Sequence, residues 1–212
     1  MKKGNITQIL KILRKQYPDS FSGSQVSEDP FQVLIGTVLS QRTRDEKTIS
    51  ASNKLFARYG NVKKLAVADS KTVAKLIKET SFYKTKAKRI IKISKILLER
   101  YKGKVPRSMQ ELISLPGVGR KTANIVLLYA FGEEEHIPVD THVHKVSNRL
   151  GLVKTKTPEK TEFALMKLVP KNYWGEINEL FVQHGQQICG TPPKCKICPI
   201  NKYCNYYSKL KK

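Results

Sequence analysis

The stretch of sequence that decides the fold is LPGVGRKTAN, residues 115–124. It places a Pro-Gly-Val-Gly turn, residues 116–119, between a short apolar segment and a longer one that starts at Lys121. Glycine adopts left-handed conformations and permits close approach, so the turn predicts a hairpin between two helices. Backbone N–H groups there, with the following helix N-terminus, can face one phosphate oxygen. A plain helix-helix turn remains the alternative, and the spacing is not that of a nucleotide-binding P-loop.

Two polar residues near the hairpin in the sequence are candidates for catalysis, and each has an ordinary structural alternative. Lys121 stands in the predicted first turn of a helix, beside Arg120. A nucleophilic lysine must lose its proton, which a neighbouring cation and a helix N-terminus both favour, but a solvated or phosphate-binding lysine is the commoner case. Asp140, in PVDTHV at residues 138–143, occupies an N-cap position. Its carboxylate could also stabilise positive charge on a sugar or activate a nucleophile. From the residues alone, capping is favoured for Asp140.

Helical periodicity extends from the hairpin in both directions, and strand-like alternation is not sustained anywhere. Asp29 and Pro30 form an N-cap and first-turn pair for a segment that is apolar on nearly all sides, which predicts a central helix. Another helix is expected to begin at Asp45 and to end at a C-terminal cap, Gly60. The sequence predicts an all-α fold with helices at residues 6–16, 31–40, 84–102, 108–113, 121–130, 141–150, 158–168 and 176–187.

All four cysteines lie near the C-terminus, at Cys189, Cys195, Cys198 and Cys204. A disulfide framework is disfavoured, because it suits small secreted domains. Four-cysteine zinc sites typically use two C-x2–4-C pairs, whereas the sequence holds one. Four thiolates of one short loop can instead wrap a [4Fe–4S] cluster, which the spacing favours modestly over zinc. Lys194, Lys196 and Lys202 are expected to surround this loop with positive charge.

The chain has 212 residues and a formal net charge of +23, which favours a nucleic acid partner over simple solubility. The helix expected at 84–102 places Lys84, Lys88, Lys92 and Lys95 in one row, which is either a solvated face or a surface for phosphates. The longest apolar run, residues 125–131, is too short for a membrane helix. The basic start lacks the apolar region of a signal peptide, so we expect a soluble, cytoplasmic, nucleoid-associated protein.

In their order and separation, the motifs at 115–124 and 139–142 and the four-cysteine loop resemble the endonuclease III family of helix-hairpin-helix DNA glycosylases. The resemblance covers nearly the whole chain, including Leu39-Ser-Gln41 and Gly185. One departure is that Cys189 and Cys195 enclose five residues, where the family usually has six. The resemblance implies two all-α domains: a six-helix barrel domain at 22–133 with its hairpin at 115–120, and an iron–sulfur cluster domain at 1–21 plus 134–212 with its cluster loop at 189–204.

The resemblance also implies roles for individual residues. Lys121 matches the lysine that attacks C1′ of the damaged nucleotide, and Asp140 matches the catalytic aspartate. Gln41 matches a wedge residue that fills the space left by the extruded nucleotide. Phe82 would enter from the other side, although relatives often carry Leu there. DNA contacts are expected at Leu115, Gly117, Val118, Gly119 and Arg120, and cluster ligation at Cys189, Cys195, Cys198 and Cys204.

These roles predict a bifunctional DNA glycosylase/AP lyase of base excision repair. It would remove oxidised or damaged pyrimidines through a Lys121 Schiff base and cut the strand 3′ to the abasic site by β-elimination. The expected partner is double-stranded DNA that carries such lesions, bound by a monomer with a [4Fe–4S] cofactor and without a membrane. The alternatives are a monofunctional glycosylase, against which Lys121 argues, and a non-enzymatic DNA-binding module, which explains the charge and the hairpin but not Lys121 with Asp140.

Overall fold

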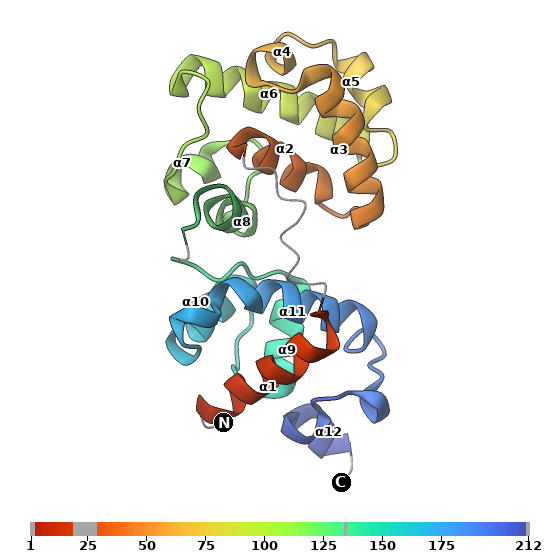
Figure 1. Cartoon of the computed structure of the whole chain (residues 1–212), viewed down its shortest axis with the longest axis vertical. Coiled ribbons are helices and arrows are strands. Elements are labelled where there is room, and N and C mark those ends of the chain that lie inside the picture. The colour runs from red at the N-terminus through yellow and green to blue at the C-terminus, as the bar shows by residue number, and fades with distance from the viewer. Residues whose placement is uncertain (1–2, 19–28, 134, 211–212) are drawn as a thin grey trace. The chain divides into compact units, whose positions relative to one another are not determined.

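The computed structural model describes residues 3–18, 29–133 and 135–210, and this part of the chain is helical with no strand (Figure 1). The predicted all-α fold is therefore confirmed. The helices follow the order α1 (Lys3–Gln16), α2 (Pro30–Ser40), α3 (Asp45–Tyr59), α4 (Val62–Ala66), α5 (Ser70–Leu76), α6 (Tyr83–Tyr101), α7 (Met109–Ser114), α8 (Arg120–Phe131), α9 (Thr141–Leu150), α10 (Pro158–Leu168), α11 (Trp174–Gln187) and α12 (Asn205–Leu210), with short 3₁₀ turns η2 (Lys171–Tyr173), η3 (Cys195–Ile197) and η4 (Asn201–Tyr203).

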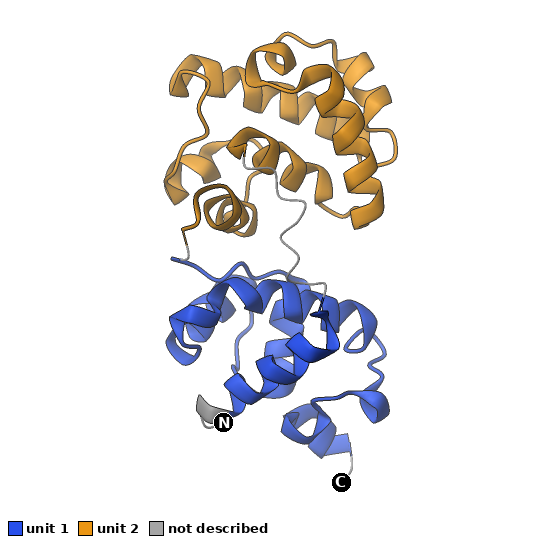
Figure 2. Cartoon of the chain, viewed as in Figure 1, with its two compact units in different colours: residues 1–25, 134–212 blue, residues 26–133 orange. Residues whose placement is uncertain are grey.

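The chain divides into two compact units, residues 26–133 and residues 1–25 with 134–212 (Figure 2). The first unit contains α2 to α8 and the second contains α1 and α9 to α12. The sequence places a boundary between residues 21 and 22, which lies outside the described residues. Each unit has its own apolar core.

Helix α2 is the centre of the first unit, as its all-round apolar sequence predicts. Asp29 accepts a hydrogen bond from the Phe31 N–H at 2.9 Å, and Pro30 supplies the preset backbone of the first turn. The helix packs against α3, α6 and α8. Burial of each large aliphatic side chain contributes about 1.5–3 kcal/mol before the entropy cost of ordering. The buried side chains of α2 are Phe31, Val33, Leu34, Ile35, Val38 and Leu39.

Helices α4 and α5 are absent from the sequence prediction. Both are too short to show a clear period, and both pack on α6 (Figure 1). Asn61 and Asp69 cap their N-termini. Gly60 ends α3 as expected, but with φ −69° rather than a left-handed conformation. A Cβ at Gly60 would lie 2.8 Å from the Phe56 carbonyl oxygen, so close approach accounts for the glycine.

Helix α6 has the expected division into an apolar face and a basic row. Ala87, Ile90, Ile91 and Leu97 are buried, whereas Lys84, Lys88, Lys92 and Lys95 are exposed. The exception is Lys86, which no sequence motif marks and which is only 2% exposed. A helix face that is otherwise apolar therefore carries a buried ammonium group.

The second unit is built around α11, whose Leu180 and Phe181 are fully buried. Helix α1 packs on α11 and buries the apolar stripe that the sequence predicts, and α9 packs on the same helix. Arg14 of α1 forms an ion pair with Glu176 of α11. No helix in the described ranges 3–18, 29–133 and 135–210 is long and apolar enough to cross a membrane.

Candidate functional site

The hairpin between α7 and α8 has the backbone that its glycines predict, but only one of them needs to be glycine for its φ angle. Gly117 has φ +72°, in the left-handed region. Gly119, the N-cap residue of α8, has φ −93°, and a Cβ added there would meet nothing within 4 Å, so its side is open. Leu115 and Val118 are 2% and 4% exposed and anchor the turn in the core, and the Val118 N–H donates to the Leu115 carbonyl at 3.1 Å.

Lys121 and Asp140 both stand at the start of a helix. Lys121 is the second residue of α8, partly exposed, directly after Arg120. Asp140 is the N-cap of α9, and its Oδ1 accepts hydrogen bonds from the His142 N–H at 2.8 Å and the Val143 N–H at 2.9 Å. The capping role that the sequence favours is therefore present. Lys121 belongs to the 26–133 unit and Asp140 to the other unit.

Gln41 lies on the hairpin. Its Nε2 donates to the Gly117 carbonyl at 2.9 Å and to the Thr122 Oγ1 at 3.3 Å. Its Oε1 accepts a hydrogen bond from Arg89 Nη1 of α6 at 3.2 Å. The structure thus joins the segment after α2, the hairpin and α6 through one carboxamide. No sequence motif marks Arg89 as a site residue. Its sequence shows only that it lies on a helix rich in basic residues.

Phe82 is the N-cap residue of α6, with φ +57° and 63% exposure. The Arg42 guanidinium lies 5.8 Å from the centroid of its ring, and Arg42 also has a positive φ, +55°. The Ser81 N–H donates to the Thr43 Oγ1 at 3.0 Å, so the loops that carry Gln41 and Phe82 are neighbours. Exposed aromatic surface and left-handed non-glycine residues are unusual, and such backbone strain concentrates at functional sites.

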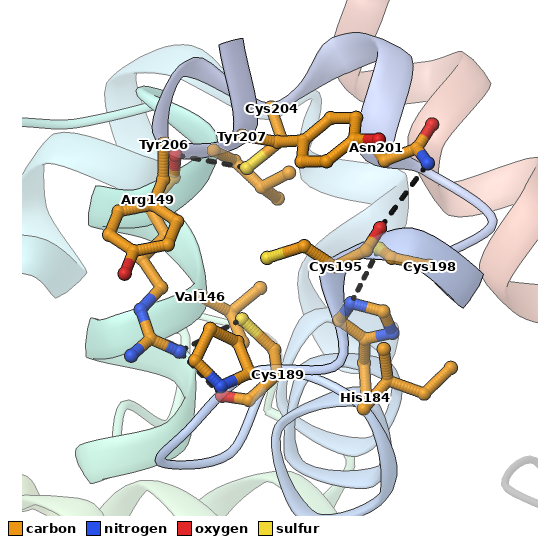
Figure 3. Close-up of a pocket in the computed structure, with 13 residues that line it drawn as sticks. Val146, Arg149, His184, Cys189, Cys195, Cys198, Asn201, Cys204, Tyr206 and Tyr207 are labelled. Carbon is orange, nitrogen blue, oxygen red and sulfur yellow. Dashed lines mark hydrogen bonds between the residues drawn. The ribbon is translucent and has the colours of Figure 1, made fainter. Parts of the chain in front are cut away.

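The four cysteines come together around one pocket in the second unit (Figure 3). All four are partly buried, and none of them forms a disulfide. Despite the five-residue gap before Cys195, Cys189 lines the same pocket as the other three cysteines. In the described part of the chain, no set of three or more His, Cys, Asp or Glu side chains converges closely enough to hold a single metal ion. Lys194, Lys196 and Lys202 are exposed around this loop, as expected.

Burial, with a smaller contribution from the neighbouring cysteines, raises the pKa of the Cys198 thiol to about 11. Burial also raises the pKa of Cys195. Metal binding needs deprotonated thiolates, so a bound metal would have to offset this cost at both positions.

Two further residues, Arg149 and His184, contact the cysteine loop, and no sequence motif pointed to them. Arg149 Nη1 donates to the Cys189 carbonyl at 2.9 Å and lies 3.4 Å from Cys189 Sγ (Figure 3). The same nitrogen donates to the Gly190 carbonyl at 2.8 Å. His184 places Nε2 3.6 Å from Cys198 Sγ and Nδ1 3.1 Å from the Tyr17 hydroxyl. Burial lowers the pKa of His184 to about 4, so its ring is neutral at physiological pH.

Gly185 brings α11 close to the start of α9. A Cβ there would lie 2.8 Å from both Cβ and Nδ1 of His142, two residues after Asp140. The absence of a side chain at Gly185 is thus what lets the two helices approach at this point.

Comparisons with known proteins agree with this architecture. A family model described as HhH-GPD superfamily base excision DNA repair protein matches residues 35–171. The fold and the hairpin therefore define the class of this protein: a helix-hairpin-helix protein of base excision DNA repair.

Relatives and solved structures narrow the assignment. Endonuclease III of Thermotoga maritima is 50% identical over 202 residues, which cover 95% of this chain and 94% of that protein. Endonuclease III of a Synechocystis species is 40% identical over 96% of this chain and 93% of that protein. A solved structure of a trapped endonuclease III–DNA covalent intermediate is 34% identical, covers all of both chains and has a TM-score of 0.89. A thermostable thymine-DNA glycosylase is 25% identical, with a TM-score of 0.82 over 97% of this chain and 98% of that one.

The chain belongs to the endonuclease III family and is a base excision repair DNA glycosylase. The resemblance drawn from the three sequence motifs is confirmed.

Proposed function

We propose that this protein removes damaged pyrimidines from double-stranded DNA through a covalent intermediate on Lys121 and then cuts the strand at the resulting abasic site. The observation that carries this proposal is the place of Lys121, in the first turn of α8 directly after the Gly117–Gly119 hairpin. A structural relative that matches the whole chain was trapped as a covalent intermediate with DNA, which supports covalent chemistry on this fold.

The chemistry begins with extrusion of the damaged nucleotide, because C1′ is out of reach of a protein nucleophile in a stacked duplex. The Lys121 Nζ, once deprotonated, forms a bond to C1′ while the bond to the base breaks, and the base leaves with the electron pair and takes up a proton. Ring opening gives an imine between Nζ and C1′. The imine acidifies the C2′ proton, whose loss expels the 3′ phosphate, and water then releases the lysine.

Asp140 supports this reaction as a carboxylate that deprotonates Lys121 or stabilises positive charge on the sugar. The hydrogen bonds from the His142 and Val143 N–H groups of its own helix both go to Oδ1. Capping therefore fixes the orientation of the carboxylate at the start of α9. Capping and catalysis are compatible roles for one side chain.

The hairpin and the loops beside it are the proposed DNA contacts. The open side of Gly119, which has no side chain to cap α8, offers the backbone N–H groups of the helix N-terminus to a phosphate, with Arg120 beside them. The buried side chains of Leu115 and Val118 anchor the turn in the core, and Gly117 supplies its left-handed backbone conformation. Gln41 is the wedge that replaces the extruded nucleotide, and exposed Phe82 enters from the other side. The basic row of α6 faces the DNA backbone.

Cys189, Cys195, Cys198 and Cys204 are the proposed ligands of a [4Fe–4S] cluster. They come from one short segment of the chain and line one pocket (Figure 3). When bound, the cluster holds the loop between α11 and α12 in shape, and the hydrolytic chemistry does not pass through it. The exposed lysines of this loop then present positive charge to DNA.

The protein is further proposed to act as a monomer in the cytoplasm, in association with the nucleoid. A monofunctional glycosylase is the second candidate, because one structural relative is a thymine-DNA glycosylase. The two candidates differ in a single measurable step, the covalent bond between the protein and C1′.

Borohydride reduction distinguishes the candidates. The wild type is mixed with a duplex that carries one abasic site or one oxidised pyrimidine, and the reduced complex is resolved on a denaturing gel. We expect a covalent band for the wild type and for Lys63→Gln, a matched control at an exposed lysine of α4, and none for Lys121→Gln. Absence of the wild-type band would refute the bifunctional reaction. A panel of single-lesion duplexes then defines the base preference, and chemical analysis for about four irons per chain, against one zinc, decides the metal.

A further inference from the structure

We propose that Lys86 and Arg89, one turn apart on α6, are positioning residues for Gln41: Lys86 fixes the backbone of its loop, and Arg89 stores its side chain on the hairpin until DNA is engaged. This inference rests on the proposed function, since it gives Gln41 the role of a wedge in the duplex. Neither α6 residue belongs to the basic row that the sequence shows.

Lys86 donates hydrogen bonds to three acceptors at the end of α2 and in the loop that follows it. Its Nζ donates to the Leu39 carbonyl at 2.6 Å, the Gln41 carbonyl at 2.7 Å and the Thr43 Oγ1 at 2.9 Å. Three acceptors match the three N–H donors of an ammonium group. The cation also lies at the C-terminus of α2, where helix carbonyls lack partners and a positive charge is favourable.

The backbone that Lys86 holds is strained. Arg42, between two of the groups bonded to Lys86, has φ +55°, which is costly for a residue other than glycine. Burial, with the charge of Arg89, lowers the pKa of Lys86 to about 8, so a cation is kept here at an energetic cost. A buried cation such as Lys86 and a strained residue such as Arg42 are kept only where the surrounding structure fixes them. Lys86 bonds to the Gln41 carbonyl, and Arg42 is the next residue in the chain, so both restrict the backbone at Gln41.

Arg89 acts on the side chain rather than on the backbone. Its Nη1 donates to Gln41 Oε1, while Gln41 Nε2 donates to Gly117 and Thr122, so the carboxamide is bonded at both ends. The Arg89 side chain runs directly over the hairpin, since a Cβ at Gly117 would lie 2.3 Å from Arg89 Nε. Gln41 cannot enter a duplex in this arrangement without leaving these partners.

DNA supplies the competitor that frees Gln41. Arg89 is partly exposed, and Lys92 lies one turn further along α6 on the surface. A phosphate oxygen accepts more strongly from a guanidinium than a neutral amide oxygen does. Phosphate contact with Arg89 therefore releases the Gln41 carboxamide at the moment when the duplex is close enough to receive it. Binding of the DNA backbone by Arg89 and insertion of Gln41 into the duplex thus become coupled steps.

The test measures base unstacking separately from chemistry. A duplex with a tetrahydrofuran abasic analogue and 2-aminopurine opposite to it is mixed rapidly with protein, and the rate of the fluorescence rise is recorded. Removal of the Arg89 bond by Arg89→Met should speed the rise by about two- to tenfold, because one stored hydrogen bond no longer has to break. Loss of the Lys86 bonds in Lys86→Met should slow it by about tenfold or more, because the loop is no longer fixed.

The same variants in a Gln41→Ala background complete a double-mutant cycle. If both residues act through Gln41, the acceleration by Arg89→Met and the slowing by Lys86→Met are lost in that background, and only an effect of lost charge remains. Lys88→Met, at an exposed lysine of the same helix, is the control for loss of charge and should change the rate equally in both backgrounds. A slower rise in Arg89→Met, or an effect of equal size with and without Gln41, would overturn the inference.

The outcome is separable from that of the proposed function. If the wild type forms no borohydride-trapped band, the lysine chemistry fails, whatever the fluorescence shows. If the band forms but the cycle shows no coupling, only the positioning roles fail. If Lys86→Met does not fold, as judged by its circular dichroism, the Arg89→Met arm decides the question.

Discussion

Replacement of Gly117 by alanine tests whether the backbone of the hairpin, rather than its side chains, is what the sequence motif preserves. Gly117 has φ +72°, and an alanine held in the left-handed region costs about 1–2 kcal/mol. The new Cβ would lie 2.3–2.5 Å from three atoms of Arg89, so this side chain must move and give up its bond to Gln41, at about 0.5–1.5 kcal/mol. Reduced entropy of the unfolded chain returns about 0.4–1 kcal/mol. The net loss of unfolding free energy is therefore about 0.5–3 kcal/mol.

Gly119→Ala is the matched control, because it makes the same chemical change two residues away. Gly119 has φ −93° and no neighbour within 4 Å of the added Cβ. Alanine is a poorer N-cap than glycine by about 1 kcal/mol, which the unfolded-state entropy of about 0.4–1 kcal/mol largely offsets, so the stability change should be within about 0.5 kcal/mol. If the N–H groups here approach a phosphate, the methyl group blocks that approach and DNA affinity falls at unchanged stability.

Equilibrium urea unfolding, followed by circular dichroism, measures the first effect, and binding to an abasic-analogue duplex measures the second. We expect Gly117→Ala to lower the unfolding free energy and Gly119→Ala to leave it alone while weakening DNA binding. Equal stability of Gly117→Ala and the wild type would refute the backbone argument. Unchanged DNA affinity in Gly119→Ala would show that its open side does not face the phosphate.

Three further predictions concern other parts of the molecule. Because the net charge is +23, DNA affinity should fall by about 10³-fold or more between 50 and 200 mM salt, if about six or more phosphates are contacted; a nearly flat titration would count against the backbone contacts. Gly185→Ala should lower the unfolding free energy by about 1–3 kcal/mol and reduce base release, since the new Cβ would lie 2.8 Å from His142, two residues after Asp140. Urea unfolding measures the first effect and a glycosylase assay the second. Wild-type values in both would contradict the close-approach argument. The pKa of Lys86 is about 8 in the folded protein, below its unfolded value, so between about pH 8 and 10 the unfolded chain binds more protons than the folded chain. The unfolding free energy of the wild type should therefore rise with pH in this range, relative to that of Lys86→Met, by up to about 3 kcal/mol. Urea unfolding at several pH values measures this difference, and parallel curves for the two proteins would contradict it.

The sequence predicts the long elements because each carries its own signal. The apolar stripe of α1, the Asp29–Pro30 start of α2 and the turn at Gly117 depend on neighbours in the chain, and the structure shows all three. Asp140 is likewise an N-cap because its acceptor and donor groups lie within three residues. By contrast, α4 and α5 are too short for a period to emerge, and their packing on α6 is what stabilises them.

By itself, the sequence determined the helical class, the hairpin, the four-cysteine loop and the family, because these rest on composition, local spacing and ordered motifs. Only the tertiary structure showed that Gln41, Lys86, Arg89 and Gly117 form one network, since the hydrogen bonds that join Gln41 to the other three span 45 to 76 positions along the chain. It also distinguished two glycines of one turn, of which one needs its φ angle and the other leaves space. The physical reason is that a backbone conformation is a local property, whereas a buried lysine or a stored side chain is defined by partners that folding brings from elsewhere.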